Sequence, residues 1–272
     1  MERVLTAGGY VEAGASGVGE PVLLIHGAIF GDAFAPLLTH PSLAGYRLLS
    51  YHRPGFLGSA RASRPFSIAD EAAVAAAVLR HFGAGSAHIV GHSFGGAIAL
   101  QLSLDNPGAA HSLSLLEPAL MMVPSAPQFF EAIGPIIAAY KRADPSAAID
   151  GFAQAVGGPN YRAALGKVLP PGWFEQAVAD ADKFFQVELP ALGEWQFSAE
   201  LAAALTQPVL AVLGADSAPL FVEGHELLKQ WLPKAEPFVL PAATHLLQMM
   251  NPDGMARALA DFFARHPMSV PL

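Results

Sequence analysis

The sequence contains no cysteine among its 272 residues. A disulfide framework, a thiolate nucleophile and a cysteine-ligated metal or iron–sulfur site are therefore excluded. Charged residues are also scarce, at 14% of the chain against about 25% in an average soluble domain. The balance of 15 Lys and Arg against 23 Asp and Glu gives a net charge of -8. No basic stripe is present, which argues against nucleic-acid binding.

Long apolar segments are missing as well. No stretch of about 18 apolar residues runs without Gly, Pro or a polar interruption, so we expect no membrane span. The start, Met1-Glu2-Arg3-Val4, is not a basic segment followed by an apolar one, as a secretory signal would be. We expect a soluble, cytoplasmic protein. Because 53% of the residues are hydrophobic, the chain should form a large core rather than remain disordered.

Short apolar runs bounded by turn formers predict the strands of a sheet. The first three are continuous rather than alternating, as strands buried on both faces require. Helices are predicted at Ser67–Phe82, with Ser67 as N-cap, and at Ser93–Leu104. This alternation predicts an α/β fold: a mostly parallel sheet with right-handed crossovers, flanked by helices. The predicted strands are Pro21–Ile25, Tyr46–Tyr51, Ala87–Val90, Leu113–Leu116, Pro208–Leu213 and Glu236–Leu240.

Residues 118–205 break the alternation of strand and helix. They contain helical stretches punctuated by Pro and Gly, of which Ser146–Val156, Trp173–Phe185 and Ser198–Leu205 are the clearest. An insertion of this size between two strands predicts a helical cap above the strand ends, where ligands bind in open α/β sheets. We therefore expect a core domain of residues 1–117 and 206–272 and a helical cap of residues 118–205.

The segment Gly91-His92-Ser93-Phe94-Gly95 fits the pattern G-x-S-x-G. It directly follows the predicted strand Ala87–Val90 and opens a helix, the context in which this pattern has a mechanical meaning. A sharp strand-to-helix turn raises the serine oxygen to the helix N-terminus, where the dipole and the free N–H groups favour negative charge. Ser93 is therefore the candidate nucleophile. The alternative is a chance match in a chain rich in Gly and Ser.

A second element is His26-Gly27-Ala28, immediately after the predicted strand Pro21–Ile25. The tetrahedral intermediate of acyl transfer carries negative charge on one oxygen, which two preorganised backbone donors stabilise. The N–H groups of Phe94 and Ala28 are the expected donors. His26 itself should brace this loop by hydrogen bonding rather than react.

His245 is the best placed of the ten histidines for acid–base chemistry. It follows the last predicted strand, on a loop that can carry it over the nucleophile as general base and then general acid. His88 and His92 are expected to pack beside the serine, and their spacing does not converge on a metal as it would on a helix. We therefore predict no metal site. The histidines expected to be superficial or structural are His52, His111, His225 and His266.

Together these elements resemble an α/β-hydrolase-fold enzyme with a helical cap, over nearly the whole chain. The resemblance includes the His-Gly loop, the nucleophile turn and the terminal His245. It also includes Tyr51-His52-Arg53-Pro54-Gly55, followed by Gly58-Ser59, in the position of the family's usual D-x-R-G-x-G-x-S segment. Tyr51 replaces the aspartate there, a departure that should concern structure more than chemistry. The order nucleophile, acid, histidine is also the family's.

Two residues are candidates for the acid that supports His245. In most relatives the acid follows the strand before the last, in a segment resembling G-x-x-D. Here that segment is Gly214-Ala215-Asp216-Ser217, so Asp216 comes one place early and Ser217 fills the usual position. Glu117 instead ends the strand after the nucleophile helix, the origin of the acid in certain dehalogenases and zearalenone-type lactonases. A carboxylate at a buried strand end needs a partner such as His⁺, so we favour Glu117, with Asp216 as the alternative.

The resulting hypothesis is hydrolysis of a carboxylic ester or lactone through an acyl-enzyme. Ser93 attacks the substrate carbonyl, His245 takes its proton, Glu117 orients and stabilises the imidazole, and Ala28 with Phe94 holds the oxyanion. No metal or organic cofactor is called for. The same triad could also serve C–C bond hydrolysis, amide cleavage or perhydrolysis. A serine excludes the dehalogenase and epoxide-hydrolase routes, because these need a carboxylate nucleophile.

Aromatic and methionine side chains crowd the expected cap and predict an apolar pocket. Such a pocket suits a small hydrophobic ester or lactone better than a charged metabolite. Met121 and Trp195 are the expected pocket walls. A hypothesis of another class is a small-ligand receptor on the same fold, whose output is binding rather than turnover. A homodimer is left open.

Overall fold

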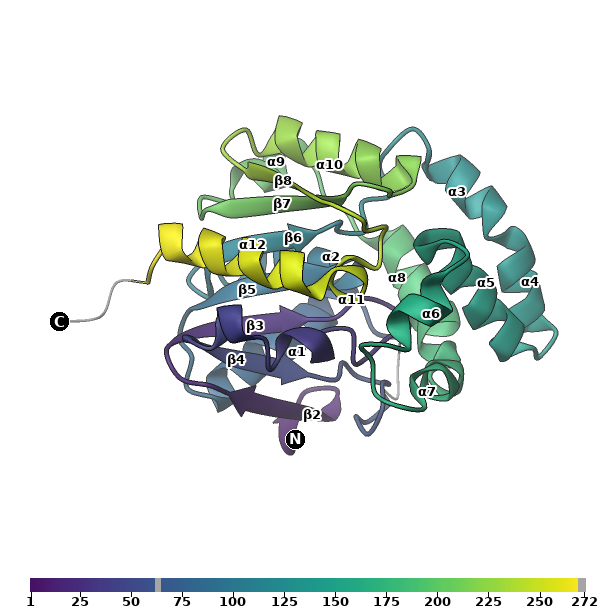
Figure 1. Ribbon diagram of the computed structural model, residues 1–272, viewed down its shortest axis with the longest axis horizontal. Helices are drawn as coiled ribbons and strands as arrows, with labels where there is room; N and C mark the ends of the chain where they lie inside the picture. The colour runs from purple at the N-terminus through teal and green to yellow at the C-terminus, as the bar shows by residue number, and fades with distance from the viewer. Residues whose placement is uncertain (62–64, 269–272) are drawn as a thin grey trace.

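The computed structural model describes residues 1–61 and 65–268. Its frame is an eight-stranded sheet in the order β1-β2-β4-β3-β5-β6-β7-β8 (Figure 1). The strands from β4 to β8 in this order run parallel, whereas β2 pairs antiparallel with both β1 and β4. The predicted fold class is confirmed. The strands are β1 (Glu2–Thr6), β2 (Gly9–Ser16), β3 (Glu20–Ile25), β4 (Tyr46–Tyr51), β5 (Ala87–His92), β6 (Ala110–Leu116), β7 (Val209–Gly214) and β8 (Glu236–Leu240).

The central strands are apolar at successive positions because helices cover both faces of the sheet. In β3, Leu23 and Ile25 join the apolar cluster formed with α1 (Ile68–His81) and α2 (Phe94–Asp105). Their neighbours Val22 and Leu24 join the cluster formed with α12 (Pro252–Arg265), which crosses the other face. Figure 1 shows α12, in yellow, lying along the sheet. Alternate side chains thus point into two separate cores.

The first of these helices begins as the sequence predicts. Ser67 Oγ accepts a hydrogen bond from the Asp70 N–H at 3.1 Å, and Asp70 Oδ2 accepts one from the Ser67 N–H at 2.9 Å. This reciprocal pair is a capping box, which satisfies amide groups that a helix leaves unpaired at its first turn. It fixes the end of α1 that lies nearest in sequence to β4.

Between β6 and β7 the described chain is helical. The helices between residues 126 and 188 gather at one end of the sheet in Figure 1 and share an apolar cluster with the loop after β3, whereas Ala202, in the last helix before β7, joins the cluster of α1 and α2. The assignment of residues 118–205 as a separate cap domain stays a prediction. The segments are α3 (Ala126–Ala132), α4 (Gly134–Lys141), α5 (Pro145–Gly157), α6 (Tyr161–Leu165), α7 (Trp173–Ala179), the π-helix η3 (Lys183–Glu188), α8 (Leu189–Glu194) and α9 (Ala199–Ala203).

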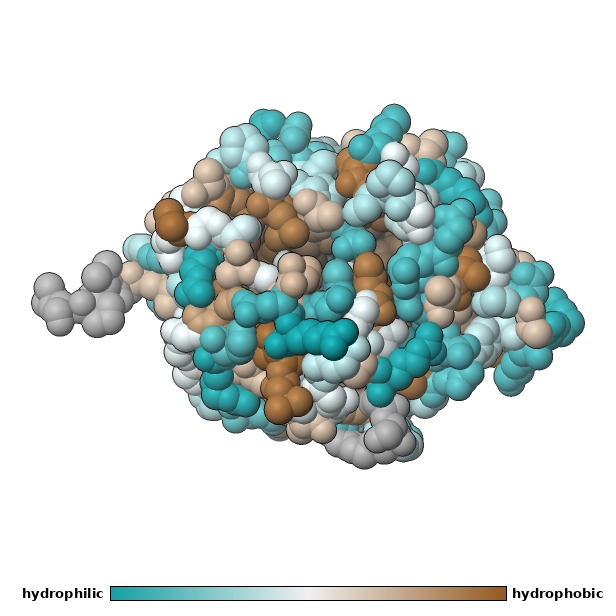
Figure 2. Space-filling model, turned by 90° about the horizontal axis from the view of Figure 1, so that it is seen from below, coloured by the Kyte–Doolittle hydropathy of each residue, from teal (hydrophilic) through white to brown (hydrophobic). Residues whose placement is uncertain are grey.

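Of the remaining elements, one packs against β7 and the others contact α12. They are α10 (Pro219–Trp231), the short α11 (Leu247–Met250) and two 3-10 turns, Ala35–Leu37 and Pro41–Leu43. In the described ranges, no helix combines the length and the apolar character that a membrane crossing requires. The face of the molecule in Figure 2 mixes hydrophilic and hydrophobic residues.

Two features differ from the sequence prediction. The hairpin β1–β2 was not predicted, because it forms the edge of the sheet and buries few large side chains, among them Val4 and Val11. The single helix predicted at residues 173–185 is instead α7, which ends at Ala179, followed by the π-helix η3. The π-helical turn carries Lys183 and Glu188 into the interior, where both are buried.

Candidate active site

Ser93 forms the whole turn between β5 and α2. Its backbone has φ 55° and ψ -118°, a conformation that side-chain-bearing residues rarely adopt. Two glycines allow the chain to approach itself here. A Cβ on Gly91 would collide with the Gly95 carbonyl, and a Cβ on Gly95 would collide with the carbonyl oxygens of β3 and the residue after it. The strained turn holds the half-buried Ser93 side chain at the N-terminus of α2.

Three side chains from distant parts of the chain form a hydrogen-bonded series. Ser93 Oγ lies 2.8 Å from His245 Nε2, and His245 Nδ1 lies 2.7 Å from Glu117 Oε2. Glu117 follows the end of β6, and His245 lies in the loop after β8. With a hydrogen on Nδ1 donated to the carboxylate, Nε2 is free to accept the serine proton. A hydroxyl held against an oriented base in this way is the arrangement of an activated nucleophile.

The Glu117 carboxylate has further donors that fix its position. Its Oε1 accepts hydrogen bonds from the Gly214 N–H at 2.7 Å and from Ser217 Oγ at 2.5 Å. The alternative acid, Asp216, has an exposed side chain, and its backbone N–H bonds to the Ala243 carbonyl. The geometry therefore favours Glu117 over Asp216 as the partner of His245. Ser217, in the position where relatives usually carry the acid, supports that carboxylate instead.

Two aromatic neighbours hold the His245 ring and its backbone. The Phe221 ring, from α10, stacks on the imidazole with centroids 3.7 Å apart and planes 10° apart. His92 Nε2 donates to the His245 carbonyl at 2.7 Å. Burial, with a smaller effect of His245, lowers the pKa of His92 to about 3, so His92 is a neutral donor at physiological pH. Phe221 had no signal in the sequence, because the stacking joins two segments that no local pattern relates.

The His26-Gly27-Ala28 loop is fixed by a fully buried arginine. Arg53 Nε donates to the His26 carbonyl at 3.0 Å, and Nη2 donates to the Gly27 carbonyl at 2.8 Å. The Arg53 N–H donates to His26 Nε2 at 3.0 Å, so the hydrogen of the His26 ring is on Nδ1 and bonds to the Gly27 carbonyl. Burial holds the pKa of His26 well below its usual value. His26 thus braces the loop that carries Ala28.

The candidate site borders a narrow cavity of about 40 Å³. Ser93 and His245 line it together with the expected oxyanion residues Ala28 and Phe94. The remaining lining is mostly apolar, and it includes Met121, Phe129, Phe152 and Phe184 from the region between β6 and β7. A substrate larger than a few atoms requires these side chains or their helices to move apart.

The expectation for Trp195 needs correction. Trp195 lies outside the lining of this cavity: its ring stacks on Phe197 with centroids 5.4 Å apart, and its Nε1–H donates to Gln101 Oε1 at 2.9 Å. The hydrogen bond anchors the segment after α8 to α2, and the stacking lies within that segment. The spacing of the aromatic residues between β6 and β7 does not show which of them line the cavity and which pack elsewhere.

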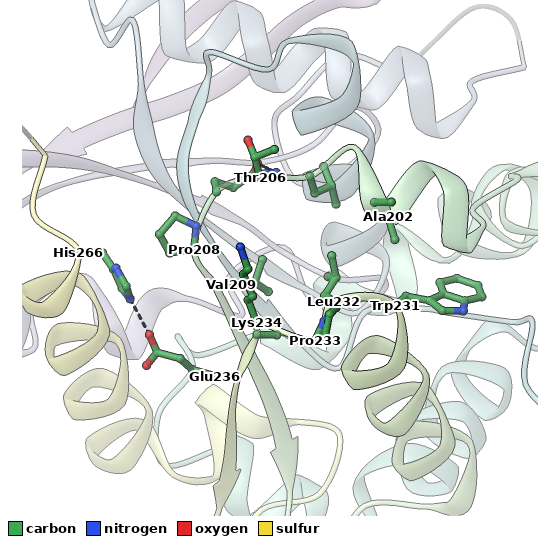
Figure 3. Close-up of a pocket in the computed structure, with 14 residues that line it drawn as sticks. Ala202, Thr206, Pro208, Val209, Trp231, Leu232, Pro233, Lys234, Glu236 and His266 are labelled. Atoms are coloured by element: carbon green, nitrogen blue, oxygen red, sulfur yellow. Dashed lines mark hydrogen bonds and ion pairs between the residues drawn. The ribbon is translucent and has the colours of Figure 1, made fainter.

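A larger cavity, of about 560 Å³, lies elsewhere (Figure 3). It is formed at the N-terminal ends of β7 and β8, whereas Glu117 and His245 follow the C-terminal ends of their strands, on the opposite side of the sheet. The labelled polar pair in it, His266 and Glu236, is joined by a 2.6 Å hydrogen bond. None of the three hydrogen-bonded residues of the candidate site lines it. Among the described residues, no group of three His, Asp or Glu side chains could hold a metal ion.

Comparison with known proteins places the chain in a family. A family model described as alpha/beta hydrolase fold matches residues 20–252. The chain is 28% identical over 269 residues to the dihydrolipoyllysine-residue acetyltransferase component of the acetoin cleaving system of Pseudomonas putida. That alignment covers 94% of this chain and 66% of the relative, so the chain spans just under two thirds of the relative's length.

Solved structures support the same fold. A thermophilic esterase from Thermogutta terrifontis is similar with a TM-score of 0.82 and 20% identity, over 98% of this chain and 99% of that one. The enol-lactonase from Burkholderia xenovorans LB400 is similar with a TM-score of 0.74 and 16% identity, over 97% and 100%. The chain belongs to the α/β hydrolase fold family, which confirms the fold that the sequence predicts.

Proposed function

We propose that this protein is a serine hydrolase that cleaves a small hydrophobic carboxylic ester or lactone through an acyl-enzyme. The observation that carries the proposal is the series of hydrogen bonds from Ser93 Oγ through His245 to Glu117, beside an apolar cavity. The names of two proteins of similar fold, an esterase and an enol-lactonase, agree with this substrate class.

In the acylation step, Ser93 Oγ attacks the carbonyl carbon of the substrate while His245 Nε2 takes the serine proton. Glu117 stabilises the imidazolium that forms and keeps its Nδ1–H in place. The carbonyl oxygen becomes negative as the tetrahedral intermediate forms. When this intermediate collapses, the bond to the leaving alkoxide breaks, and the imidazolium gives its proton to that oxygen. In a lactone the leaving oxygen stays attached to the acyl group.

The second half of the reaction repeats these roles with water. His245 removes a proton from a water molecule, whose oxygen attacks the acyl carbon. The second tetrahedral intermediate then expels Ser93 Oγ, which recovers its proton from His245. The carboxylic acid leaves, and the starting state returns with no net change in the protein.

The N–H groups of Ala28 and Phe94 are the proposed oxyanion donors in both halves. Phe94 is the first residue of α2, whose first-turn amides have no partner within the helix, and the helix dipole favours negative charge there. Ala28 follows the loop that Arg53 and His26 hold rigidly. Donors that are fixed before the reaction are the effective ones, because no reorganisation is needed when charge develops.

Hydrolysis of p-nitrophenyl esters of increasing acyl length tests the proposal. The wild-type protein should release p-nitrophenolate, and Ser93→Ala should lower kcat by at least about 10⁴-fold. A thermal melt of Ser93→Ala serves as the control for folding. Turnover that persists in Ser93→Ala would show that another group reacts. If no acyl length gives Ser93-dependent turnover, the proposal fails, and the result favours the hypothesis of a small-ligand receptor.

A further inference from the structure

A buried network of four charged side chains adjoins the candidate site. Arg53 Nη1 donates to Glu71 Oε1 at 3.2 Å, Arg53 Nη2 donates to Glu188 Oε1 at 2.6 Å, and Lys183 Nζ donates to Glu71 Oε1 at 2.6 Å. All four side chains are at least nine-tenths buried. Two cations face two carboxylates, so the group is balanced in charge. Buried ions require such partners, since desolvation without them is costly.

The network joins the sheet region to the helices inserted after β6. Glu71 lies in α1 and Arg53 in the loop after β4, whereas Lys183 and Glu188 lie at the two ends of the π-helix η3. Arg53 also holds the carbonyls of His26 and Gly27, as described above. The carboxylate of Glu188 is therefore anchored at the base of the loop that carries one proposed oxyanion donor.

One carboxylate oxygen of Glu188 has no hydrogen-bond partner among the described residues. It is Oε2, which is buried, whereas Oε1 accepts from Arg53. Buried polar atoms without a partner are rare in folded proteins, because their lost hydration is not replaced. Among the described residues that line the cavity of Ser93 and His245, Glu188 is the one with a carboxylate. The residue with this unpaired acceptor thus borders a cavity whose other walls are mostly apolar.

Glu71 provides a contrast within the same network. Its Oε2 is also without a partner in the described chain, yet Glu71 does not line the cavity. The two carboxylates therefore share burial, charge partners and an unpaired oxygen. They differ in that Glu188 lines the cavity and Glu71 does not.

We propose that Glu188 Oε2 is a specificity-determining acceptor that receives a hydrogen bond from a neutral N–H or O–H donor on the substrate, a few bonds from the scissile carbonyl. This inference rests on the proposed function and narrows its substrate class to esters or lactones with such a donor. A neutral donor fits better than an ammonium group, because Arg53 and Lys183 already supply two positive charges. Burial, with a smaller contribution from Glu71, raises the pKa of Glu188, although Arg53 and Lys183 oppose that rise.

Two esters that differ by one group test this assignment. In p-nitrophenyl N-acetylglycinate an N–H stands where p-nitrophenyl 4-oxopentanoate has a CH₂. The measured quantity is the ratio of kcat/KM for the first ester to that for the second. Because the intrinsic reactivity of each ester is the same with every variant, a change in this ratio between variants reports recognition by the protein.

Glu188→Gln should lower the ratio by about tenfold or more. The glutamine oxygen must turn toward Arg53, which has only donors, so the amide NH₂ occupies the position of Oε2 and cannot accept. Glu71→Gln is the matched control: it makes the same change in the same network away from the cavity. It should keep the wild-type ratio.

The wild-type protein alone provides a second measurement, which does not depend on whether a variant folds. Acetamidomethylboronic acid and 3-oxobutylboronic acid carry the same pair of groups and bind serine hydrolases as analogues of the tetrahedral intermediate. The N–H compound should inhibit about tenfold more strongly than the CH₂ compound.

Each other outcome has a defined meaning. An unchanged ester ratio in folded Glu188→Gln, or equal inhibition by the two boronic acids, overturns the assignment. Ser93-dependent turnover would in that case leave the proposed function standing. A ratio that falls equally in Glu71→Gln assigns the effect to the integrity of the network and also overturns direct recognition. If Ser93-dependent turnover of both esters is absent in the wild type, the proposed function fails, and this inference fails with it.

Discussion

Replacement of Glu117 by its amide is the change that most sharply separates the two candidate acids. Glu117 Oε1 accepts from the Gly214 N–H, a backbone donor that cannot reverse its role. In Glu117→Gln the amide oxygen must therefore stay at that position, and the NH₂ group faces His245 Nδ1. The imidazole then has to accept at Nδ1 and carry its hydrogen on Nε2. In this tautomer it cannot take the proton of Ser93.

The size of the effect follows from that tautomer. The equivalent acid-to-amide change in a Ser-His-Asp triad lowers kcat about 10⁴-fold, so we expect a loss of about 10³-fold to 10⁴-fold here. This corresponds to about 4–5.5 kcal/mol of transition-state stabilisation. Asp216→Asn changes an exposed side chain that lies away from the imidazole, and it should alter kcat by less than about twofold.

Steady-state hydrolysis of a p-nitrophenyl ester measures both variants, with circular dichroism as the control for folding. The reasoning is refuted if folded Glu117→Gln keeps kcat within about tenfold of the wild type. A large loss in Asp216→Asn would instead assign the acid to Asp216. Losses in both would mean that each carboxylate contributes, which the exposed position of Asp216 does not explain.

Three further predictions concern the surroundings of the site. Ser217→Ala removes one hydrogen-bond donor from Glu117 and should lower kcat about threefold to tenfold. Ser217→Thr keeps the hydroxyl and should keep most of the activity. Equal losses of kcat in the two variants would contradict a positioning role for Ser217. Gly95→Ala should lower the free energy of unfolding, measured in urea, by about 3 kcal/mol or more, because the added Cβ meets backbone carbonyls. Gly85→Ala places its Cβ in open space and should leave this free energy unchanged. Similar stabilities of the two variants would refute the close packing at Gly95. His92 has a folded pKa of about 3 against 6.5 in the unfolded chain, so below pH 6.5 the unfolded state binds the proton first and stability falls. Between pH 7 and pH 5 the wild type should lose about 2 kcal/mol more than His92→Gln, and parallel pH profiles would contradict a neutral buried His92.

Much of the candidate site was accessible from sequence because its signals are local. The G-x-S-x-G pattern lies between an apolar strand and a helix, and it indicates a nucleophile only in that context. His245 could be chosen from ten histidines by its place after the last strand. Glu117 stood out as a carboxylate at the end of a buried run, where a charge needs a partner.

The parts that sequence did not reveal depend on contacts between distant segments. Arg53 and Glu188 are 135 residues apart, and nothing around Glu188 distinguishes it from the other acidic residues. Its burial follows from the π-helix η3, a geometry without a sequence signature here. Trp195 was misassigned for the same reason, since only the packing shows which aromatic rings face the cavity. The hairpin β1–β2 escaped prediction because an edge position needs few large apolar residues.

The central claim is that Ser93 is a nucleophile activated by His245. Covalent labelling measures this directly: the protein is incubated with a p-nitrophenyl phosphonate, and its intact mass and peptide masses are recorded. The account predicts one phosphonyl group per chain, located on the peptide with Ser93, and no label in Ser93→Ala. Labelling in folded His245→Ala should be at least about 10³-fold slower. An unlabelled wild-type protein, or a label on another residue that persists in Ser93→Ala, would contradict the account.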